Sequence, residues 1–442
     1  MNRGATQVPL RRSLGRFSIV MMLLIASVGI GGSAANAASF AVNSASDAGD
    51  LVLDGVCDVG GGDCTLRAAI QEVNFLGGAG HSISFRIPGP TPHAIAIGSA
   101  LPTIVAGVVI DATTEPGPGT APKIILDGSG SGPIDGIHIT GSGVTIRGFV
   151  IQNFGDEGIE VVGSGSTIAG NYVGVRSNGS TPAGNDDGIL VRGSNNTIGG
   201  PNADDRNVVG GNRDDGISLD GADNNVIRGN YVGVTADGTG TAGNGGEGIA
   251  VQFGAADNII RNNVVGGNSG SGILLRSAGT DDNEIVGNRI GTNPTGTAAR
   301  GNSGSGLLIT DFNGVATGTR ITGGNLISGN GVHGIFLQDK DGTGTVIQGN
   351  FIGTNAAGTT ALANTLDGIY ADADDVVIGG SGVGNLISGN GRDGIRLEQI
   401  DQIVRGNLIG TNAAGVGPIP NGQDGIDTGS GTSGSQIGGI AA

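Results

Sequence analysis

The feature that most constrains this sequence is an internal repeat. The strings GNYVGV, GNYVGV, GNRIGT, GNFIGT and GNLIGT begin at positions 170, 229, 287, 349 and 406. Between them, NVVGGN begins at 207 and 263 and NLISGN begins at 325 and 385, so each unit is a pair of similar half-units. Self-similarity of this kind is typical of solenoids, in which each repeat packs on its neighbours. The 92 glycines therefore belong to a periodic structure and not to a flexible linker.

A second motif marks every half-unit and predicts its secondary structure. It reads DGIHIT at 135, DGISLD at 215 and DGIRLE at 393, and eleven copies begin between 135 and 424. Apolar and polar residues alternate after the glycine, as in Ile217, Ser218 and Leu219, which is the period of a strand with one buried face. Each half-unit thus predicts one coil of about three short strands separated by Gly/Asn turns. Stacked coils predict an all-β parallel β-helix, a solenoid with a core of Ile, Val and Leu.

The asparagines of the GN pairs recur where a predicted strand ends. Asparagine tolerates the left-handed backbone conformation that sharp turns need. Its amide can also bond to the equivalent amide of the next coil. We therefore expect stacked asparagines along the solenoid axis.

From about Ala106 onward, these repeats resemble the right-handed parallel β-helix proteins of the pectin-lyase-like superfamily. The resemblance rests on the copies of GNxIGT, NLISGN and DGI, and it implies a right-handed β-helix over residues 106–442. It implies no single activity, because that superfamily includes lyases, hydrolases, epimerases, adhesins and proteins without chemistry. The final SQIGGIAA matches the start of a half-unit and then stops, so we expect the natural protein to continue beyond Ala442.

Residues 1–37 predict a secretory signal peptide. Four arginines precede the apolar run FSIVMMLLIASVGI, and small residues lead to a cleavage site after Ala37. No later segment is apolar enough to predict a membrane span. Residues 1–37 hold four of the 22 Lys+Arg and none of the 39 Asp+Glu, so the exported chain would carry 18 basic and 39 acidic residues, a net charge of −21. This acidity argues against a nucleic-acid partner, since phosphate binding needs a basic surface.

The segment 38–105 predicts a cap on the N-terminal end of the solenoid. Apolar residues fall on one helical face of the string CTLRAAIQEVN and could cover the open edge of the first coil: Leu66, Ala69, Ile70 and Val73. A partner-binding helix is the alternative. Cys57 and Cys64 are expected to form a disulfide in preference to a metal pair, because an exported chain meets oxidising conditions.

The string CTLRAA also resembles the CSLREA signature of a short domain found near the N-termini of exported, repeat-rich bacterial proteins. The serine and the glutamate of that signature are absent here. The resemblance implies export and a surface role, and it implies no catalysis.

An acid precedes Gly-Ile in eight of the eleven motif copies, at Asp135, Glu157, Asp187, Asp215, Glu247, Asp367, Asp393 and Asp424. A catalytic acid is needed once, whereas a turn residue is needed in every coil, so the repetition predicts a structural role for Asp393. Stacked carboxylates repel one another, and calcium could bridge them. The candidate calcium ligands are Asp187, Asp215, Asp367 and Asp393. No GGxGxD calcium-loop repeat occurs, and no other cofactor is indicated.

The motif changes in three consecutive copies, where Ser271, Ser305 and His333 replace the acid. Around these copies the outward position between two buried residues becomes large and apolar, at Leu274, Leu308, Phe336 and Tyr370. These side chains are expected to stack as a stripe on the outer wall, which makes the stripe and His333 a candidate site for a sugar or another chain. The alternative is that loops inserted in the two longest half-units cover the stripe.

The sequence leaves open whether the chain is an enzyme. Cleavage of a glycan needs two positioned carboxylates, or a calcium ion with a strong base nearby. The candidate catalytic residues near the stripe are Arg276, Asp372, Arg396 and Glu398. GVHG around His333 does not match the Gly-His-Gly of the superfamily's hydrolases. A copper-delivery role lacks ligands, because every Met lies in the predicted signal peptide and the four His are scattered.

These patterns predict an exported protein, secreted or at the cell surface, that acts as a scaffold or adhesin-like binding module. Its expected partner is an extracellular polysaccharide or another surface protein. A polysaccharide lyase or glycoside hydrolase is the alternative.

Overall fold

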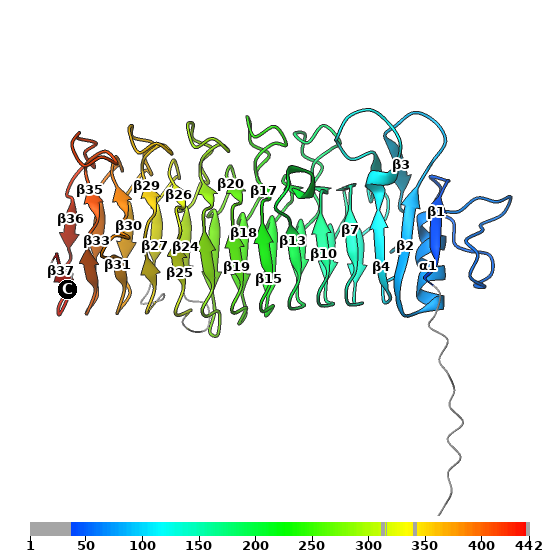
Figure 1. Ribbon diagram of the computed structural model, residues 1–442, viewed down its shortest axis with the longest axis horizontal. Helices are drawn as coiled ribbons and strands as arrows, with labels where there is room; N and C mark the ends of the chain where they lie inside the picture. Colours follow the sequence, from blue (N-terminus) through cyan, green and yellow to red (C-terminus); the bar gives the residue numbers. More distant parts are fainter. Residues whose placement is uncertain (1–36, 311–313, 315, 339–342, 439–442) are drawn as a thin grey trace, which may run out of the picture. The chain divides into compact units, whose positions relative to one another are not determined.

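The computed structural model describes residues 37–310, 314, 316–338 and 343–438, and these form a parallel β-helix (Figure 1). Its strands build three parallel sheets of 14, 12 and 11 strands, here called sheets A, B and C. The predicted all-β solenoid with about three short strands per coil is confirmed. The predicted signal peptide lies outside the described residues, apart from Ala37.

The element bounds follow the repeat. Sheet A contains β1 (Ser39–Val42), β2 (Ala79–Phe85), β4 (Gly107–Asp111), β7 (Thr145–Arg147), β10 (Thr167–Ala169), β13 (Thr197–Gly199), β16 (Val226–Arg228), β19 (Ile259–Arg261), β22 (Glu284–Val286), β25 (Arg320–Thr322), β28 (Val346–Ile347), β31 (Val377–Gly379), β34 (Ile403–Arg405) and β37 (Gln436–Ile437). Sheet B contains β3 (His93–Ala96), β5 (Ile124–Asp127), β8 (Phe149–Gln152), β11 (Tyr172–Val173), β14 (Val208–Val209), β17 (Tyr231–Val232), β20 (Val264–Val265), β23 (Arg289–Ile290), β26 (Leu326–Ile327), β29 (Phe351–Ile352), β32 (Leu386–Ile387) and β35 (Leu408–Ile409). Sheet C contains β6 (Ile137–Ile139), β9 (Ile159–Val161), β12 (Ile189–Val191), β15 (Ile217–Asp220), β18 (Ile249–Gln252), β21 (Ile273–Arg276), β24 (Leu307–Thr310), β27 (Ile335–Leu337), β30 (Ile369–Ala371), β33 (Ile395–Leu397) and β36 (Ile426–Thr428). The helical segments are α1 (Leu66–Leu76), η1 (Ala112–Thr114) and η2 (Ala203–Asp205).

Inward-facing side chains form apolar rows along the solenoid axis. In sheet C, the residue after each motif glycine starts such a row, and Ile217, Ile249 and Ile273 pair in register and are fully buried. Burying one side chain of this size stabilises the fold by about 1.5–3 kcal/mol. The rows also fix the register, because a slip of one residue would turn every inward side chain toward solvent.

Buried asparagines stack along the axis, as predicted. In one column, Asn171 Nδ2 donates to Asn207 Oδ1 at 3.1 Å, and Asn207 Nδ2 donates to Asn230 Oδ1 at 3.0 Å. Each amide also donates to a backbone carbonyl of the preceding coil, as Asn207 does to Ile168. A second column runs from Asn185 through Asn212 and onward. These bonds satisfy amide groups that the fold removes from water.

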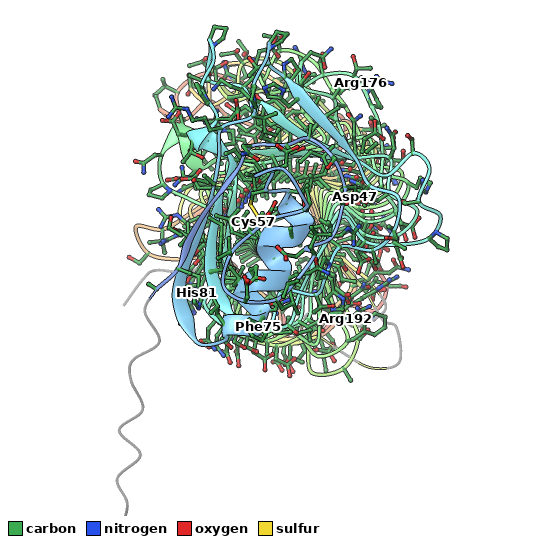
Figure 2. All side chains as sticks on the ribbon, turned by 90° about the vertical axis from the view of Figure 1, so that its right-hand side faces the viewer. Asp47, Cys57, Phe75, His81, Arg176 and Arg192 are labelled. Atoms are coloured by element: carbon green, nitrogen blue, oxygen red, sulfur yellow. A yellow bond between two sulfur atoms is a disulfide. The ribbon has the colours of Figure 1, made fainter. Side chains whose placement is uncertain are left out.

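Residues before β4 close one end of the coils, and Figure 2 looks onto this end. The predicted face of α1 is buried: Leu66, Ala69, Ile70 and Val73. Thr65 caps the helix, since its Oγ1 accepts from the Ala68 N–H at 3.1 Å and donates to the Ala48 carbonyl at 2.6 Å. β1 and β2 pair with each other and β2 pairs with β4, so sheet A begins before residue 106.

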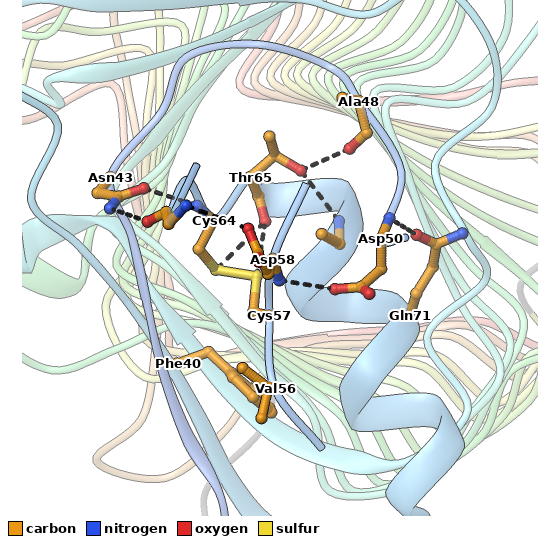
Figure 3. The surroundings of a disulfide bond; sticks show 12 residues. Phe40, Asn43, Ala48, Asp50, Val56, Cys57, Asp58, Cys64, Thr65 and Gln71 are labelled. Atoms are coloured by element: carbon orange, nitrogen blue, oxygen red, sulfur yellow. Dashed lines mark hydrogen bonds between the residues drawn. A yellow bond between two sulfur atoms is a disulfide. The ribbon is translucent and has the colours of Figure 1, made fainter. Parts of the chain in front are cut away.

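The predicted disulfide is present in this segment. Cys57 and Cys64 are joined by an S–S bond of 2.01 Å beside the start of α1 (Figure 3). The buried Glu72 of the helix accepts from the N–H groups of Asp54 and Gly55 at 3.1 and 2.6 Å. The disulfide and this carboxylate therefore tie the 50s loop to the helix that covers the first coil.

Loops between sheets B and C account for the longest half-units, and they stack on one another. Ala356 N–H donates to Gly296 O at 2.9 Å, and Ala413 N–H donates to Gly358 O at 2.8 Å. Gly296 lies against Leu326 and Gly358 lies against Leu386, which are residues on the outer face of sheet B. These loops were the expected cover of the apolar stripe on sheet C, but they pack over sheet B instead.

Candidate functional site

The outward-facing row of sheet C carries the side chains of the predicted stripe. Strands β21, β24, β27 and β30 pair in register at Leu274, Leu308, Phe336 and Tyr370. Arg396 on β33 and Asp427 on β36 continue the row. The expected stacking on the outer wall is confirmed. Asp427 did not stand out in the sequence, although it occupies the same motif position in DGIDTG.

Three rings of this region form what we call the aromatic cluster: His333, Phe336 and Tyr370. The centroids of Phe336 and Tyr370 are 5.1 Å apart at an interplanar angle of 78°, an edge-to-face contact. The His333 ring lies 4.8 Å from Phe336 and 5.2 Å from Tyr370. Aromatic pairs of this kind contribute about 0.5–1.5 kcal/mol beyond burial, so the rings hold one another in place.

The aromatic cluster is closed on one side and open on the other. His333 is only 6% exposed, whereas Phe336 and Tyr370 are half-buried. The guanidinium carbon of Arg396 lies 5.7 Å from the Tyr370 ring centroid, within cation–π range. The two half-buried rings thus present an aromatic surface beside a cation.

His333 is held by the acid of the next coil. Its Nδ1 lies 3.2 Å from Asp367 Oδ2 and 3.3 Å from the Asp367 backbone nitrogen. A neutral ring can accept from that N–H, and a protonated ring can donate to the carboxylate. Burial works to raise the pKa of Asp367, but bonds from His333 and from the Asp393 N–H hold the pKa below its usual value.

Arg396 is clamped between two carboxylates. Its Nε donates to Glu398 Oε1 at 2.7 Å, and its Nη1 lies 3.1 Å from Asp427 Oδ2. The hydrogen bond to Glu398 raises the pKa of the Arg396 guanidinium further, against a smaller opposing effect of desolvation. Burial, followed by the charge of Glu398, raises the pKa of Tyr370. Arg396 is therefore a permanent cation that Glu398 and Asp427 orient.

Of the other candidate catalytic residues, Asp372 follows β30 beside the strand of Arg396, whereas Arg276 is not brought together with Arg396. Asp372 Oδ1 accepts from Gln399 Nε2 at 2.6 Å. Arg276 Nε donates to Gln252 Oε1 at 2.6 Å, and its strand lies four strands along sheet C from that of Arg396. At about 4.8 Å per strand, this separation is roughly 19 Å. Arg276 therefore belongs to a different part of the wall.

The acids before Gly-Ile form hydrogen bonds mainly with the neighbouring coil along the solenoid axis. Asp367 Oδ1 accepts from the Asp393 N–H at 3.0 Å, and Asp393 Oδ1 accepts from the Asp424 N–H at 2.8 Å. In earlier coils, Asp187 accepts from the Asp215 N–H at 2.8 Å in the same way. These acids thus bind the backbone of the next coil, which is the structural role expected for Asp393.

In the earlier coils this arrangement leaves carboxyl groups crowded. Burial, with the nearby charge of Asp215, raises the pKa of Asp187 to about 8. Burial likewise raises the pKa of Asp215 to about 7, with a contribution from Asp214. Calcium bridging by Asp187, Asp215, Asp367 and Asp393 stays a prediction.

Two other groups, not singled out in the sequence, place ligand atoms closely enough to hold a cation. One consists of Asp135, His138 and Glu160, and the other of Asp135, Asp156 and Glu157; within each group the ligand atoms lie within 4.8 Å of one another. A hydrogen bond with Glu157 is the largest cause that raises the pKa of Asp156 to about 6. The sequence offered little indication of these groups, because His138 and Glu160 occupy the outward position of the motif, where the residue type varies from copy to copy.

Comparison with known proteins identifies the family. Residues 134–366 match the family described as the right handed beta helix region, which is more than half of the chain. The chain therefore belongs to the right-handed β-helix family. No curated protein sequence matches it significantly. The matched region begins after residues 38–105, so the similarity of CTLRAA to the CSLREA signature stays a prediction.

Several solved structures are similar in fold. The Dettilon tailspike protein matches with a TM-score of 0.49 and 17% identity, over 85% of this chain and 66% of the tailspike chain. The A-module of a mannuronan C-5 epimerase from Azotobacter vinelandii matches with a TM-score of 0.44 and 16% identity, over 88% of this chain and 98% of the module. A pectate lyase matches with a TM-score of 0.42 and 14% identity, over 91% of this chain and 80% of the enzyme. Within the described residues, no helix has the length and apolar character needed to cross a membrane.

Proposed function

We propose that this chain is an exported binding module, secreted or at the cell surface, that holds an extracellular polysaccharide against the aromatic cluster. The observation that carries the proposal is the in-register row in which Phe336 and Tyr370 are half-buried beside the oriented cation Arg396. Exposed aromatic faces pack on apolar faces of sugar rings, and a neighbouring cation adds an attraction for negatively charged groups.

Export is part of this proposal. The predicted signal peptide supports it, and so does the Cys57–Cys64 disulfide, because such bonds persist in oxidising compartments. A solenoid also suits an extended ligand, since its outer rows run along the axis and repeat at each coil.

The site favours binding over bond cleavage. A lyase would need a base that loses its proton, but Glu398 raises the pKa of Arg396 and keeps it charged. Glu398 itself is engaged with Arg396, and Asp372 accepts from Gln399. A polysaccharide lyase or glycoside hydrolase at this face is the second candidate, and it rests on the presence of these two carboxylates near the aromatic cluster.

The test of binding is calorimetry with a panel of acidic and neutral oligosaccharides. The double variant Phe336→Ser/Tyr370→Ser is expected to lose binding, because both ring faces are removed. Phe75→Ser is the matched control, since Phe75 is 54% exposed on α1 at the N-terminal end (Figure 2). Undiminished binding by the double variant would contradict the site.

The second candidate is tested with the same oligosaccharides by mass spectrometry of the products, with and without calcium. We expect no products. Products that disappear in Asp372→Asn or Glu398→Gln would instead make the aromatic cluster part of an active site.

A further inference from the structure

A cavity at the corner between sheets A and B collects arginines in a protein whose net charge is −17. Its volume is about 380 Å³, and we call it the arginine pocket. The lining includes Arg206, Arg228, Arg289, Tyr231, Asn262 and Pro294, and none of the described residues in it is acidic. It lies on different sheets from the aromatic cluster, so nothing inferred about it depends on the proposed function.

The repeat itself brings these side chains together. Arg228 ends β16 and pairs in register with Arg261, which ends β19. Arg289 begins β23 and pairs with Val264, which in turn pairs with Tyr231. The register thus places Arg228 beside Arg261 on sheet A, and the arginine pocket lies between Arg228 of sheet A and Arg289 of sheet B.

The remaining wall comes from an insertion. The segment that contains η2 ends at Arg206, whose guanidinium carbon lies 3.9 Å above the Tyr231 ring centroid. Asp205 of η2 is turned to other partners, since it lies 3.6 Å from Arg147 Nη2 and accepts from Asn202, and Asp204 is exposed outside the pocket lining. The insertion thus adds a cation to the arginine pocket without adding a carboxylate.

The charges around this pocket lack counter-ions among the residues that the structure describes. In the part of the chain that the structure describes, no ion pair involves Arg206, Arg228, Arg261 or Arg289, although all four are partly buried. Within the described residues, Nε of Arg206 in the pocket lining is buried without a hydrogen-bond partner, and so is Nε of Arg261, which lies beside Arg228 and outside the lining. Partly buried like charges with unused donors are unfavourable unless an anion occupies the site.

We propose that the arginine pocket binds an oxyanion: a carboxylate, sulfate or phosphate group, either as a free anion or as part of a small ligand. Guanidinium groups present paired N–H donors that match the oxygens of such groups. The volume lies in the range of small-molecule sites. Nucleic acid does not fit, because its binding requires an extended basic surface and the whole chain is acidic.

Titration calorimetry tests the proposal on the full exported chain. The probes are inorganic sulfate, inorganic phosphate and glucuronate, with glucose as the neutral control and chloride at matched ionic strength. We expect the anions to bind and glucose not to bind. Similar affinities for glucuronate and the inorganic anions would show that the charged group suffices, whereas binding of the inorganic anions alone would identify a site for free anions.

The variant Arg228→Gln/Arg289→Gln is expected to bind the anions at least about ten-fold more weakly, because charge-assisted hydrogen bonds are lost. Its melting temperature without anion should stay equal to that of the wild type or rise, since like-charge repulsion is removed. Arg176→Gln is the control, because Arg176 is exposed and lies outside the pocket lining.

If the double variant does not fold, the single variant Arg206→Gln replaces it in the binding assay. This variant leaves Arg228 and Arg289 on their strands unchanged. No heat from any anion with the wild type overturns the proposal. Unchanged affinity in the folded variants, or an equal loss in Arg176→Gln, overturns it as well.

Discussion

The outward row of sheet C is closed over β15, β18 and β21 and open over β27 and β30, although the strands beneath have the same register. In the closed part, Ser218, Ala250 and Leu274 are at most 3% exposed. The Gln252 amide links two neighbours: its Nε2 donates to Ser218 Oγ at 3.2 Å, and its Oε1 accepts from Arg276 Nε. Polar side chains are therefore hydrogen-bonded to one another across this part of the wall. In the open part, Phe336 and Tyr370 are only half-buried.

The difference shows how a solenoid separates folding from function. Inward rows and asparagine columns continue unchanged through both parts, so they fix the coil. The outward position is free to vary, because a change there alters the wall without altering the register. Function is therefore expected where the outward residues depart from the repeat.

The largest predicted effect tests whether the two parts share the same interior. Ile249→Ala lies under the closed part and Ile335→Ala under the open part, and both side chains are fully buried. Each change should lower the free energy of unfolding by about 2–5 kcal/mol, because it removes buried methyl groups and leaves a cavity. Chemical denaturation followed by circular dichroism measures this loss. A much smaller loss for Ile335→Ala would mean that the interior is also loosened beneath the aromatic cluster.

A smaller effect is expected from the crowded acids of the earlier coils. The pKa of an unfolded aspartate is about 3.9. Folding raises the pKa of Asp187 to about 8 and of Asp215 to about 7, chiefly through burial. Between about pH 4 and pH 7–8 the folded chain thus retains protons that the unfolded chain has lost, so the free energy of unfolding falls as pH rises.

Asp215→Asn removes one of these charges and keeps an oxygen that can accept from the Glu247 N–H. The variant should exceed the wild type in stability at pH 8 by about 2–4 kcal/mol, since three pKa units correspond to about 4 kcal/mol, and match it near pH 4. Urea titrations at both pH values measure the difference, with the exposed Asp257→Asn as control. If the variant and the wild type differ in stability by the same amount at pH 8 and at pH 4, folding does not raise the pKa of Asp215. Calcium that bridged the acids would reduce the wild type's pH dependence, and a chelator would restore it.

The sequence predicted the parts of this structure that repeat. Because the motif occurs eleven times, its spacing alone was enough to predict the coil and the register of Leu274 to Tyr370. The same spacing predicted the stacked asparagines and the structural role of Asp393. The disulfide followed from two closely spaced cysteines in a chain that the sequence predicts to be exported. The position predicted for the loops over sheet B was wrong, because spacing shows that an insertion exists but not which face of the solenoid it covers.

The arginine pocket and the His138 groups escaped sequence analysis for a related reason. Arg206 reaches Tyr231 through an insertion that occurs in one coil. Arg228 and Arg261 look like ordinary surface residues until their strands pair. Contacts that depend on a single irregular segment leave no periodic signal.

The smallest predicted effect on stability belongs to the open part of the row. Phe336→Ser/Tyr370→Ser should lower the free energy of unfolding by only about 1–2 kcal/mol, because the rings are half-buried on the outer wall and lose mainly their edge-to-face contact. The same denaturation assay measures it beside Ile335→Ala, which lies on the same strand as Phe336 but faces inward. A loss as large as that of Ile335→Ala would place the aromatic cluster in the core and remove it as a surface for a ligand. A small loss together with abolished oligosaccharide binding would separate the two faces of one strand into a structural face and a functional face.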